Sequence, residues 1–313
     1  MRKAFTQTLV ELAAHDPRVL LLTADLGFMV LEPFIERFPG RFFNLGVAEQ
    51  NMMGVATGLA DAGFTPFVYS IATFATLRGY EFLRNGAVLH RLPVRVVGVG
   101  GGFEYGVAGV THHGLEDLGA LRLQPDLAII APADFQQAQT ALRETWDVPG
   151  PVYYRLGRDE QTTVPGLNGA FARGRVQVVR EGDDVLWITT GAITSEVTAA
   201  AARLAQEGIS SAIAVVASLA PPPIDDLVRL LQAFPAAITV EAHYRTGGLG
   251  SLVAEVIADR GLTCQLDRCG VETMPRGQVG SQRFMQEQAG LSAEQLVRRA
   301  THVLKASCRN SCP

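Results

Sequence analysis

The feature that most restricts the fold of this 313-residue chain is a steady alternation of strand-like and helix-like segments. Short apolar runs such as Val19–Thr23, Pro66–Ile71 and Val94–Val99 have the length and β-branched content of buried strands. Amphipathic or small-residue segments of helical length separate these runs. Because alternating strands and helices build mainly parallel sheets with helices on their faces, the sequence predicts an α/β protein.

The alternation is interrupted once, which predicts two domains. Residues 1–160 contain one complete set of elements that ends with the strand Val152–Arg155. Residues 161–183 are richer in Gly, Arg, Thr and Asn and lack sustained apolar periodicity, as is typical of a linker. A second alternation over 184–305 predicts a smaller domain, and 306–313 is left as a tail. Each domain is expected to be a mainly parallel sheet covered by helices.

Composition and charge exclude several classes of function. Hydrophobic residues make up 48% of the chain and charged residues 19%, a balance typical of a compact fold rather than a disordered chain. The formal net charge of -4 gives no basic surface for nucleic acid. The N-terminus enters an amphipathic pattern directly, so we expect no leader, no contact with a membrane and a cytoplasmic location.

Neither the glycine clusters nor the cysteines form a recognised binding motif. Gly98–Gly102 places Phe103 where the last glycine of a dinucleotide fingerprint belongs, and Gly247–Gly250 also fails that spacing. The cysteines have spacings outside the paired pattern of zinc sites and are assigned no role. They are Cys264, Cys269, Cys308 and Cys312. No metal ligand is therefore assigned to this chain.

The most informative segment runs from Asn44 to Gly54 and contains one carboxylate, Glu49. Glu49 begins a predicted helix whose following turns are nearly all small or apolar, down to about Ala62. A carboxylate at this place commonly favours the positive end of the helix. A buried carboxylate with a chemical role is the other interpretation, and it needs a partner that the neighbouring residues do not supply. The residues alone leave both interpretations open.

Ordered motifs across nearly the whole chain resemble transketolases and deoxyxylulose-phosphate synthases. In chain order they are Gly46–Gln50, Pro66–Ser70, Thr73–Phe74, Tyr105–Asp117, Glu241–His243 and Gly247–Ser251. The first four resemble the pyrimidine-binding domain of these enzymes, and the last two are similar to their C-terminal domain. Several motifs in the right order are more specific than any one of them alone.

The resemblance implies that the chain binds the pyrimidine end of thiamine diphosphate. Glu49 would share a proton with N1′ of the aminopyrimidine and so favour the imino tautomer that activates the cofactor. Phe74 would stack on the pyrimidine, Leu77 and Tyr80 would complete its pocket, and Asp25 would lie close to the cofactor. Without the resemblance, we would interpret Phe74, Leu77 and Tyr80 as ordinary core residues. Asp25 would be a turn residue or a helix cap.

The resemblance also implies substrate contacts. His112, on a glycine-rich loop, would face the reacting carbon, where an imidazole can move a proton. Arg155 would bind a substrate phosphate, and Arg2 matches a further substrate position, although so near the terminus it could simply be solvated. Two departures stand where transketolases carry polar contacts, Ala108 for an aspartate and Gly100 for a histidine. Losing them weakens recognition of an ordinary sugar phosphate and predicts an unusual donor or acceptor.

The family also implies a Mg²⁺ (or Ca²⁺) ion held by a Gly-Asp-Gly motif and a later asparagine, and this sequence has no match. The nearest segment, Gly182-Asp183-Asp184, leads directly into a predicted strand. We therefore expect a separate N-terminal, diphosphate-binding subunit to hold the metal in an α2β2 assembly. The start of the resemblance at the N-terminus agrees with this expectation.

The predicted activity is transfer of a two-carbon ketol unit from a small ketose to an acceptor, catalysed together with the partner subunit. One alternative is the β subunit of a 2-oxoacid dehydrogenase E1-like or hybrid enzyme, which passes the two-carbon unit to a lipoyl or carrier-protein arm. Another is a non-catalytic partner subunit that keeps only the interface.

Overall fold

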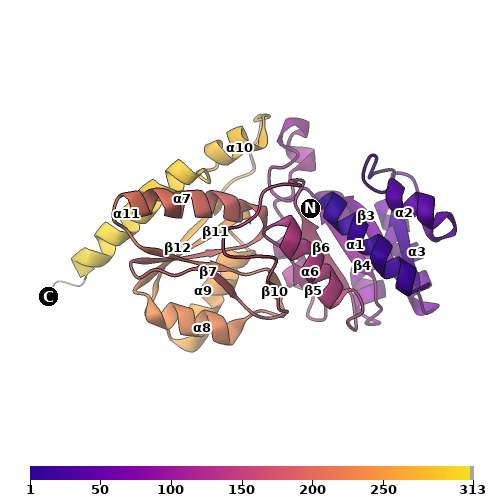
Figure 1. Cartoon of the computed structure of the whole chain (residues 1–313), viewed down its shortest axis with the longest axis horizontal. Coiled ribbons are helices and arrows are strands. Elements are labelled where there is room, and N and C mark those ends of the chain that lie inside the picture. Colours follow the sequence, from indigo (N-terminus) through magenta and orange to yellow (C-terminus); the bar gives the residue numbers. More distant parts are fainter. Residues whose placement is uncertain (311–313) are drawn as a thin grey trace.

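The structure is a computed structural model, and it describes residues 1–310. Two α/β domains lie side by side along the long axis of the molecule (Figure 1). The first is built on a seven-stranded sheet of order β10-β5-β6-β4-β3-β1-β2, and the second on a five-stranded sheet of order β12-β11-β8-β9-β7. The predicted fold class is confirmed.

In the first domain, six parallel strands form the sheet. They are β1 (Val19–Thr23), β2 (Phe42–Asn44), β3 (Thr65–Ile71), β4 (Arg95–Val99), β5 (Ala128–Ile130) and β6 (Val152–Leu156). All of them except the edge strand β2 are buried along their whole length. Helices cover both faces, which is why these strands read as continuous apolar runs.

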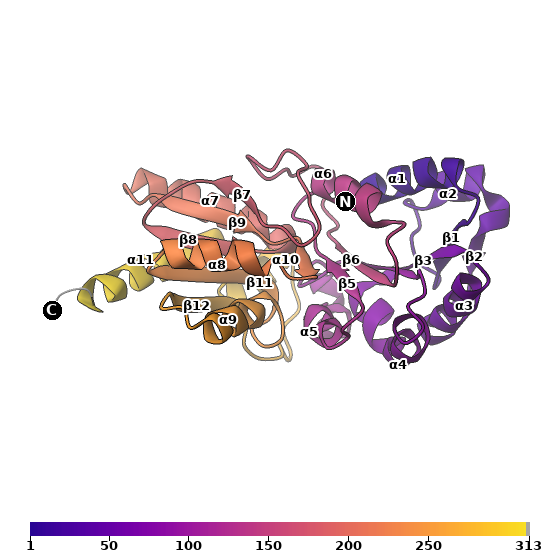
Figure 2. The ribbon, with the colours of Figure 1, turned by 90° about the horizontal axis from the view of Figure 1, so that it is seen from below.

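The helices of the first domain form one layer on each side of the sheet. They are α1 (Arg2–His15), α2 (Glu32–Arg37), α3 (Glu49–Asp61), α4 (Tyr80–Phe82), α5 (Asp117–Arg122) and α6 (Phe135–Thr145). Figure 2 shows α1 and α6 on one face and α3, α4 and α5 on the other. Alternate strand residues face each layer, so Leu21 packs with Phe5 of α1 while Leu22 packs with Met52 of α3.

The stretch from Phe74 to Val88 is helical, but much of it is π-helical. The π-helical segments Phe74–Arg78 and Leu83–Val88 stand on either side of α4. Between them, Gly79 lies so close to α3 that an added Cβ would be 3.3 Å from Met53 Cβ and 3.4 Å from the carbonyl oxygen of Glu49. The absence of a side chain at Gly79 therefore lets this segment pack against the start of α3. Wider π turns are frequent at functional sites.

The second domain has four parallel strands and one antiparallel edge strand. They are β7 (Gln177–Arg180), β8 (Val185–Thr189), β9 (Ser211–Val215), β11 (Ala236–Tyr244) and β12 (Gln265–Val271). Its helices are α7 (Thr194–Gln206), α8 (Ile224–Ala233), α9 (Leu249–Arg260), α10 (Gln282–Gln288) and α11 (Ala293–Asn310). In Figure 1, α7 and α11 lie on one side of this sheet and α8 and α9 on the other.

Three elements lie outside the predicted pattern. Strand β7, within the predicted linker 161–183, pairs with β9 of the second sheet. The three-residue strand β10 (Ser218–Ala220) leaves the second domain and pairs antiparallel with β5, so it extends the sheet of the first domain. Helix α11 continues into the predicted tail as far as Asn310. The strands β7 and β10 have only four and three residues, so local sequence pattern carries little signal for them.

Candidate active site

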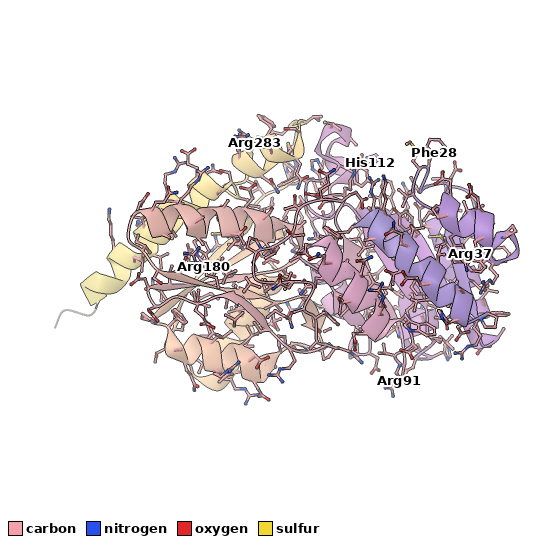
Figure 3. All side chains as sticks on the ribbon, in the orientation of Figure 1. Phe28, Arg37, Arg91, His112, Arg180 and Arg283 are labelled. Carbon is pink, nitrogen blue, oxygen red and sulfur yellow. The ribbon has the colours of Figure 1, made fainter. Side chains whose placement is uncertain are left out.

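Functional candidates gather where the parallel strands of the first sheet end. Loops leave this carboxyl edge after β1, β3 and β4, and open α/β sheets bind ligands at that edge. Figure 3 labels Phe28 and His112 on the same side of the domain, whereas Arg91, which precedes β4, lies on the opposite side. The sheet thus brings residues from distant parts of the sequence to one edge.

Glu49 is buried at the first turn of α3, with 2% of its surface exposed. Its Oε1 accepts a hydrogen bond of 3.1 Å from Ser70 Oγ at the end of β3. Its Oε2 accepts one of 2.7 Å from Arg78 Nη1, which also forms an ion pair with it. These two contacts supply the partners that burial of a carboxylate requires. Glu49 is thus a buried carboxylate with two specific side-chain partners.

Phe74 connects Glu49 to His112. The guanidinium carbon of Arg78 lies 3.9 Å from the centre of the Phe74 ring, a cation–π contact. The His112 ring meets the same Phe74 ring edge-on, with 5.0 Å between ring centres. A cleft of about 570 Å³ lies beside this group and is lined by residues 47–51 and Arg78. Glu49, Phe74 and His112 therefore belong to one local cluster.

Leu77 and Tyr80 are placed differently from Phe74. Leu77 is 44% exposed. The Tyr80 hydroxyl donates a 2.9 Å hydrogen bond to the carbonyl oxygen of Ala120 and accepts one from Gln124, and its ring packs against the core of the domain. Like Phe74, neither residue is among those that line the cleft beside Glu49. In this chain Tyr80 ties α4 to α5.

Asp25 lies beside a second, smaller cavity. It adopts a left-handed backbone conformation (φ 57°) in the loop after β1 and exchanges two hydrogen bonds with Asn44, of 3.0 and 3.1 Å. The cavity holds about 240 Å³, and its lining includes Arg2, Asp25, Ser70 and Tyr105. Because the Ser70 hydroxyl also contacts Glu49, the smaller cavity and the cleft lie on either side of this serine.

Arg155 does not face either opening. It is 5% exposed and donates to Asp117 at 2.8 and 3.1 Å, to Gly114 O at 2.6 Å and to Ala242 O at 3.0 Å. Burial opposes ionisation of Asp117, yet the neighbouring Arg155, His243 and Tyr153, through charge and hydrogen bonds, together outweigh it and hold the pKa of that carboxyl below its usual value. The guanidinium predicted to bind a phosphate instead joins the glycine-rich loop to the second domain.

Arg158, three residues later, is a candidate that no sequence motif indicated. Its guanidinium lies 4.4 Å from the centre of the Tyr105 ring and donates to the carbonyl oxygen of Glu104 at 2.7 Å. The Nε atom of Arg158 is buried without a hydrogen-bond partner among the described residues, whereas that of Arg2 makes no hydrogen bond there but lies 3.4 Å from Glu160 Oε1 in an ion pair. The unsatisfied cationic donor of Arg158 near the smaller cavity suits an anionic group. The sequence offers no motif or spacing that would have favoured Arg158 over Arg155 as the anion-binding residue.

The structure also explains why a histidine is absent at position 100. Gly100 has φ +78°, and an added Cβ would lie 2.1 Å from Cε2 of Tyr105. The aromatic ring therefore fills the space into which a side chain at Gly100 would extend. On the same loop His113 is buried, and burial lowers its pKa, so of the two adjacent histidines only the partly exposed His112 borders the site.

The second glycine cluster is satisfied within the second domain. The Glu241 carboxylate accepts hydrogen bonds from the backbone N–H groups of Leu249 and Gly250, of 2.7 and 2.8 Å, at the start of α9. A Cβ on Gly248 would lie only 1.9 Å from Glu241 Oε2. The motif thus builds an internal helix cap.

The remaining predictions concern metal binding and membranes. Cys264 and Cys269 are free and buried, whereas the side chain of Cys308 and all of Cys312 lie outside the described part of the chain. Within that described part, no group of three His, Cys, Asp or Glu side chains is placed to hold a metal ion. No helix among the same residues is both long and apolar enough to cross a bilayer.

Comparison with known proteins identifies the family. Residues 1–162 match the transketolase pyrimidine binding domain, and residues 174–296 match the transketolase C-terminal domain. The fold and these matches thus define a two-domain chain whose first domain is a transketolase pyrimidine binding domain. The chain belongs to the transketolase family, whose activity depends on thiamine diphosphate. The resemblance predicted from the sequence is confirmed.

Individual relatives are similar to this chain over most of its length. A 6-deoxy-6-sulfo-D-fructose transketolase subunit from Clostridium sp. is 33% identical and covers 97% of this chain and 94% of its own. A subunit of an apulose-4-phosphate transketolase from Phocaeicola vulgatus is also 33% identical and covers 82% of this chain and 83% of its own. A split-gene transketolase, solved as an inactive β4 tetramer, superposes with a TM-score of 0.88 at 34% identity. The match covers 97% of this chain and 98% of that protein.

Proposed function

We propose that this chain is the pyrimidine-binding subunit of a two-component transketolase, which moves a two-carbon ketol unit from a ketose to an acceptor. The observation that carries the proposal is the buried Glu49 carboxylate in one cluster with Phe74 and His112 at the carboxyl edge of the sheet. The names of the relatives support the same class of reaction.

The residues of the cluster fit the aminopyrimidine of thiamine diphosphate. Glu49 would hold a proton at N1′ of that ring, and Phe74 would provide an aromatic face for it. When bound, thiamine diphosphate supplies a carbon nucleophile that adds to the ketose carbonyl. Leu77, Tyr80 and Asp25 stay predicted cofactor neighbours. Tyr80 would act through packing, since its hydroxyl is already hydrogen-bonded.

The substrate would lie between His112 and the smaller cavity. His112, half-buried beside Phe74, is placed to move a proton to or from a substrate hydroxyl. Arg158 would bind an anionic end of the substrate through its unsatisfied Nε atom. Arg2, which lines the smaller cavity and pairs with Glu160, would add a second positive charge. We assign this role to Arg158 in place of Arg155, because Arg155 is buried and its donors are already engaged.

A partner subunit would cover this edge and hold the metal. Four apolar side chains on the loops around the site are more than two-thirds exposed: Phe28 (87%), Met29 (74%), Val107 (71%) and Val47 (70%). Exposed apolar groups clustered at one edge are typical of an interaction surface. We propose that the partner is the diphosphate-binding subunit, that it holds Mg²⁺ (or Ca²⁺), and that the assembly is α2β2.

The direct test combines the purified chain with that partner, thiamine diphosphate and Mg²⁺. Release of the shortened aldose would be measured over a panel of ketose phosphates and sulfonates with several aldose acceptors. We expect transfer by the wild type and by Glu207→Gln, an exposed carboxylate far from the site, and loss of transfer by Glu49→Ala. Full activity of Glu49→Ala would contradict the proposal. Transfer only to a lipoyl arm would favour the E1-like alternative, and no cofactor binding would favour the non-catalytic one.

A further inference from the structure

Arg78 takes both contacts that the proposed function gives to the aminopyrimidine. Its Nη1 donates to Glu49 Oε2 at 2.7 Å, and its guanidinium carbon lies 3.9 Å from the centre of the Phe74 ring. No sequence motif indicated a role for this residue. Its position therefore needs an explanation that the cofactor contacts alone do not provide.

The chemistry of a guanidinium explains how it can replace the ring. A guanidinium is flat, donates N–H groups in its plane and stacks on aromatic faces. An aminopyrimidine protonated at N1′ is also flat, donates an N–H and offers a face for stacking. Glu49 and Phe74 would therefore recognise either group with the same atoms.

Local structure places Arg78 where it can do this. Phe74 and Arg78 are the first and last residues of one π-helical segment, which ends at Gly79 beside the start of α3. The side chain of Glu49 is 1% exposed, whereas that of Arg78 is 43% exposed and lines the open cleft. The arginine can thus move into solvent while the carboxylate cannot.

We propose that Arg78 is a positioning residue that contacts Glu49 and Phe74 before the cofactor binds and leaves them when the aminopyrimidine enters. The inference rests on the proposed function, because it assumes that this cleft receives the cofactor. Before the cofactor binds, Arg78 supplies the buried Glu49 carboxylate with a charged partner. This avoids the free-energy cost of an unpaired buried charge. On binding, the ring takes over that partner's place.

The exchange implies competition between Arg78 and the cofactor. If the site is open in only a fraction of molecules, the apparent Kd exceeds the intrinsic Kd by the reciprocal of that fraction. Arg78→Met keeps an unbranched apolar stem and removes the charge and the donors. We expect this variant, assembled with the partner, to bind thiamine diphosphate and Mg²⁺ about 3- to 10-fold more tightly by titration calorimetry. Arg78→Lys keeps the charge without the flat fork and should lie between the two.

The matched control is Arg84→Met, an exposed arginine six residues further along, in the next π-helical segment, which should leave the Kd unchanged. Unchanged or weaker cofactor binding by Arg78→Met would overturn the inference. If the wild-type pair itself binds no cofactor, the proposed function fails first, and the inference falls with it. Wild-type binding with an unimproved variant leaves the proposed function standing and removes only the role of Arg78.

A second measurement needs no variant and covers the case in which Arg78→Met does not fold. Phenylglyoxal labels accessible arginines, and peptide mass spectrometry reports the rate at each position. With the wild-type assembly, the labelling rate of Arg78 should rise several-fold when thiamine diphosphate and Mg²⁺ are added, while that of Arg84 stays constant. A fall in the Arg78 rate, or no change, would show that Arg78 remains on Glu49, and would reject the exchange.

Discussion

Both domains place a buried carboxylate at the start of a helix, yet the two carboxylates are satisfied in different ways. Glu241 accepts two backbone N–H groups of α9, and neither can leave without unwinding the helix. Glu49 accepts from two side chains, and one of them, Arg78, is 43% exposed. A carboxylate with fixed backbone donors is a structural cap, whereas one with a displaceable partner beside an open cleft can receive a ligand.

The largest expected effect tests the Glu49 side of this comparison. Glu49→Gln keeps the shape of the side chain but cannot hold a proton, so turnover of the assembled enzyme should fall about 10³-fold, as is typical for loss of a general acid–base group. The free energy of unfolding should change little, because an amide can still accept from Ser70 and the half-exposed Arg78 can turn its guanidinium to water. Steady-state kinetics and urea unfolding of the same samples measure both quantities.

Glu241→Gln is the comparison variant for this experiment. We expect its specific activity, corrected for the folded fraction, to stay near that of the wild type. If Glu241→Gln loses as much turnover as Glu49→Gln at equal folded fraction, the distinction between cap and site is wrong.

The next largest effect concerns Asp117, a third buried carboxylate, whose partner is the equally buried Arg155. Removing one member of a buried ion pair strands the other, so Asp117→Ala should lower the free energy of unfolding by about 3 kcal/mol. Urea denaturation of the free chain measures the change. Asp61→Ala, at the exposed end of α3, is the control and should change stability by less than about 0.5 kcal/mol.

The Asp117 variant also tests the reassignment of Arg155. If Arg155 bound substrate phosphate directly, freeing its guanidinium from Asp117 would mainly alter the KM for anionic donors and leave stability almost unchanged. We expect the reverse, because the guanidinium joins Gly114 O to Ala242 O across the two domains.

A smaller effect tests the cap in the second domain. Glu241→Gln replaces a carboxylate that accepts two backbone N–H groups with an amide that can accept only through its oxygen. Hydrogen bonds to charged groups are worth more than neutral ones, so we expect a loss of about 2 kcal/mol in unfolding free energy. Glu255→Gln, on the exposed side of the same helix, removes a surface ion pair with Arg122 and should cost less than about 1 kcal/mol.

The same contrast between local pattern and distant partners explains what the sequence could predict. The position of Glu49 at a helix start followed from local pattern, but its partners lie 21 and 29 residues further along and meet it only because β3 ends beside α3. Arg155 and Arg158 are only three residues apart. Arg155 is buried within β6, whereas Arg158 follows the end of that strand, and the local sequence does not distinguish the two. Strand β10 has three residues and gains its partner from the other domain. Local hydrophobic periodicity predicts secondary structure but not such long-range contacts.

The smallest effect concerns Glu104, another buried carboxylate. It accepts from the backbone N–H of Arg158, and burial raises its pKa to about 7. The folded chain therefore binds more protons than the unfolded chain between about pH 4.5 and 7. Stability from this group is fully present below that window and is lost as the pH rises through 7, with a slope that approaches about 1.4 kcal/mol per pH unit.

Glu104→Gln isolates this contribution, because other titrating groups such as the amino group of Met1 and the neighbouring arginines are present in both proteins. Unfolding free energies of wild type and variant would be measured by urea denaturation at half-unit intervals from pH 5 to 7.5. We expect the wild type to lose stability relative to Glu104→Gln as the pH rises across this range. Parallel curves would mean that Glu104 is ionised in the folded chain throughout. It would then be held, like Asp117, by the charges of Arg155 and Arg158 rather than neutralised by burial.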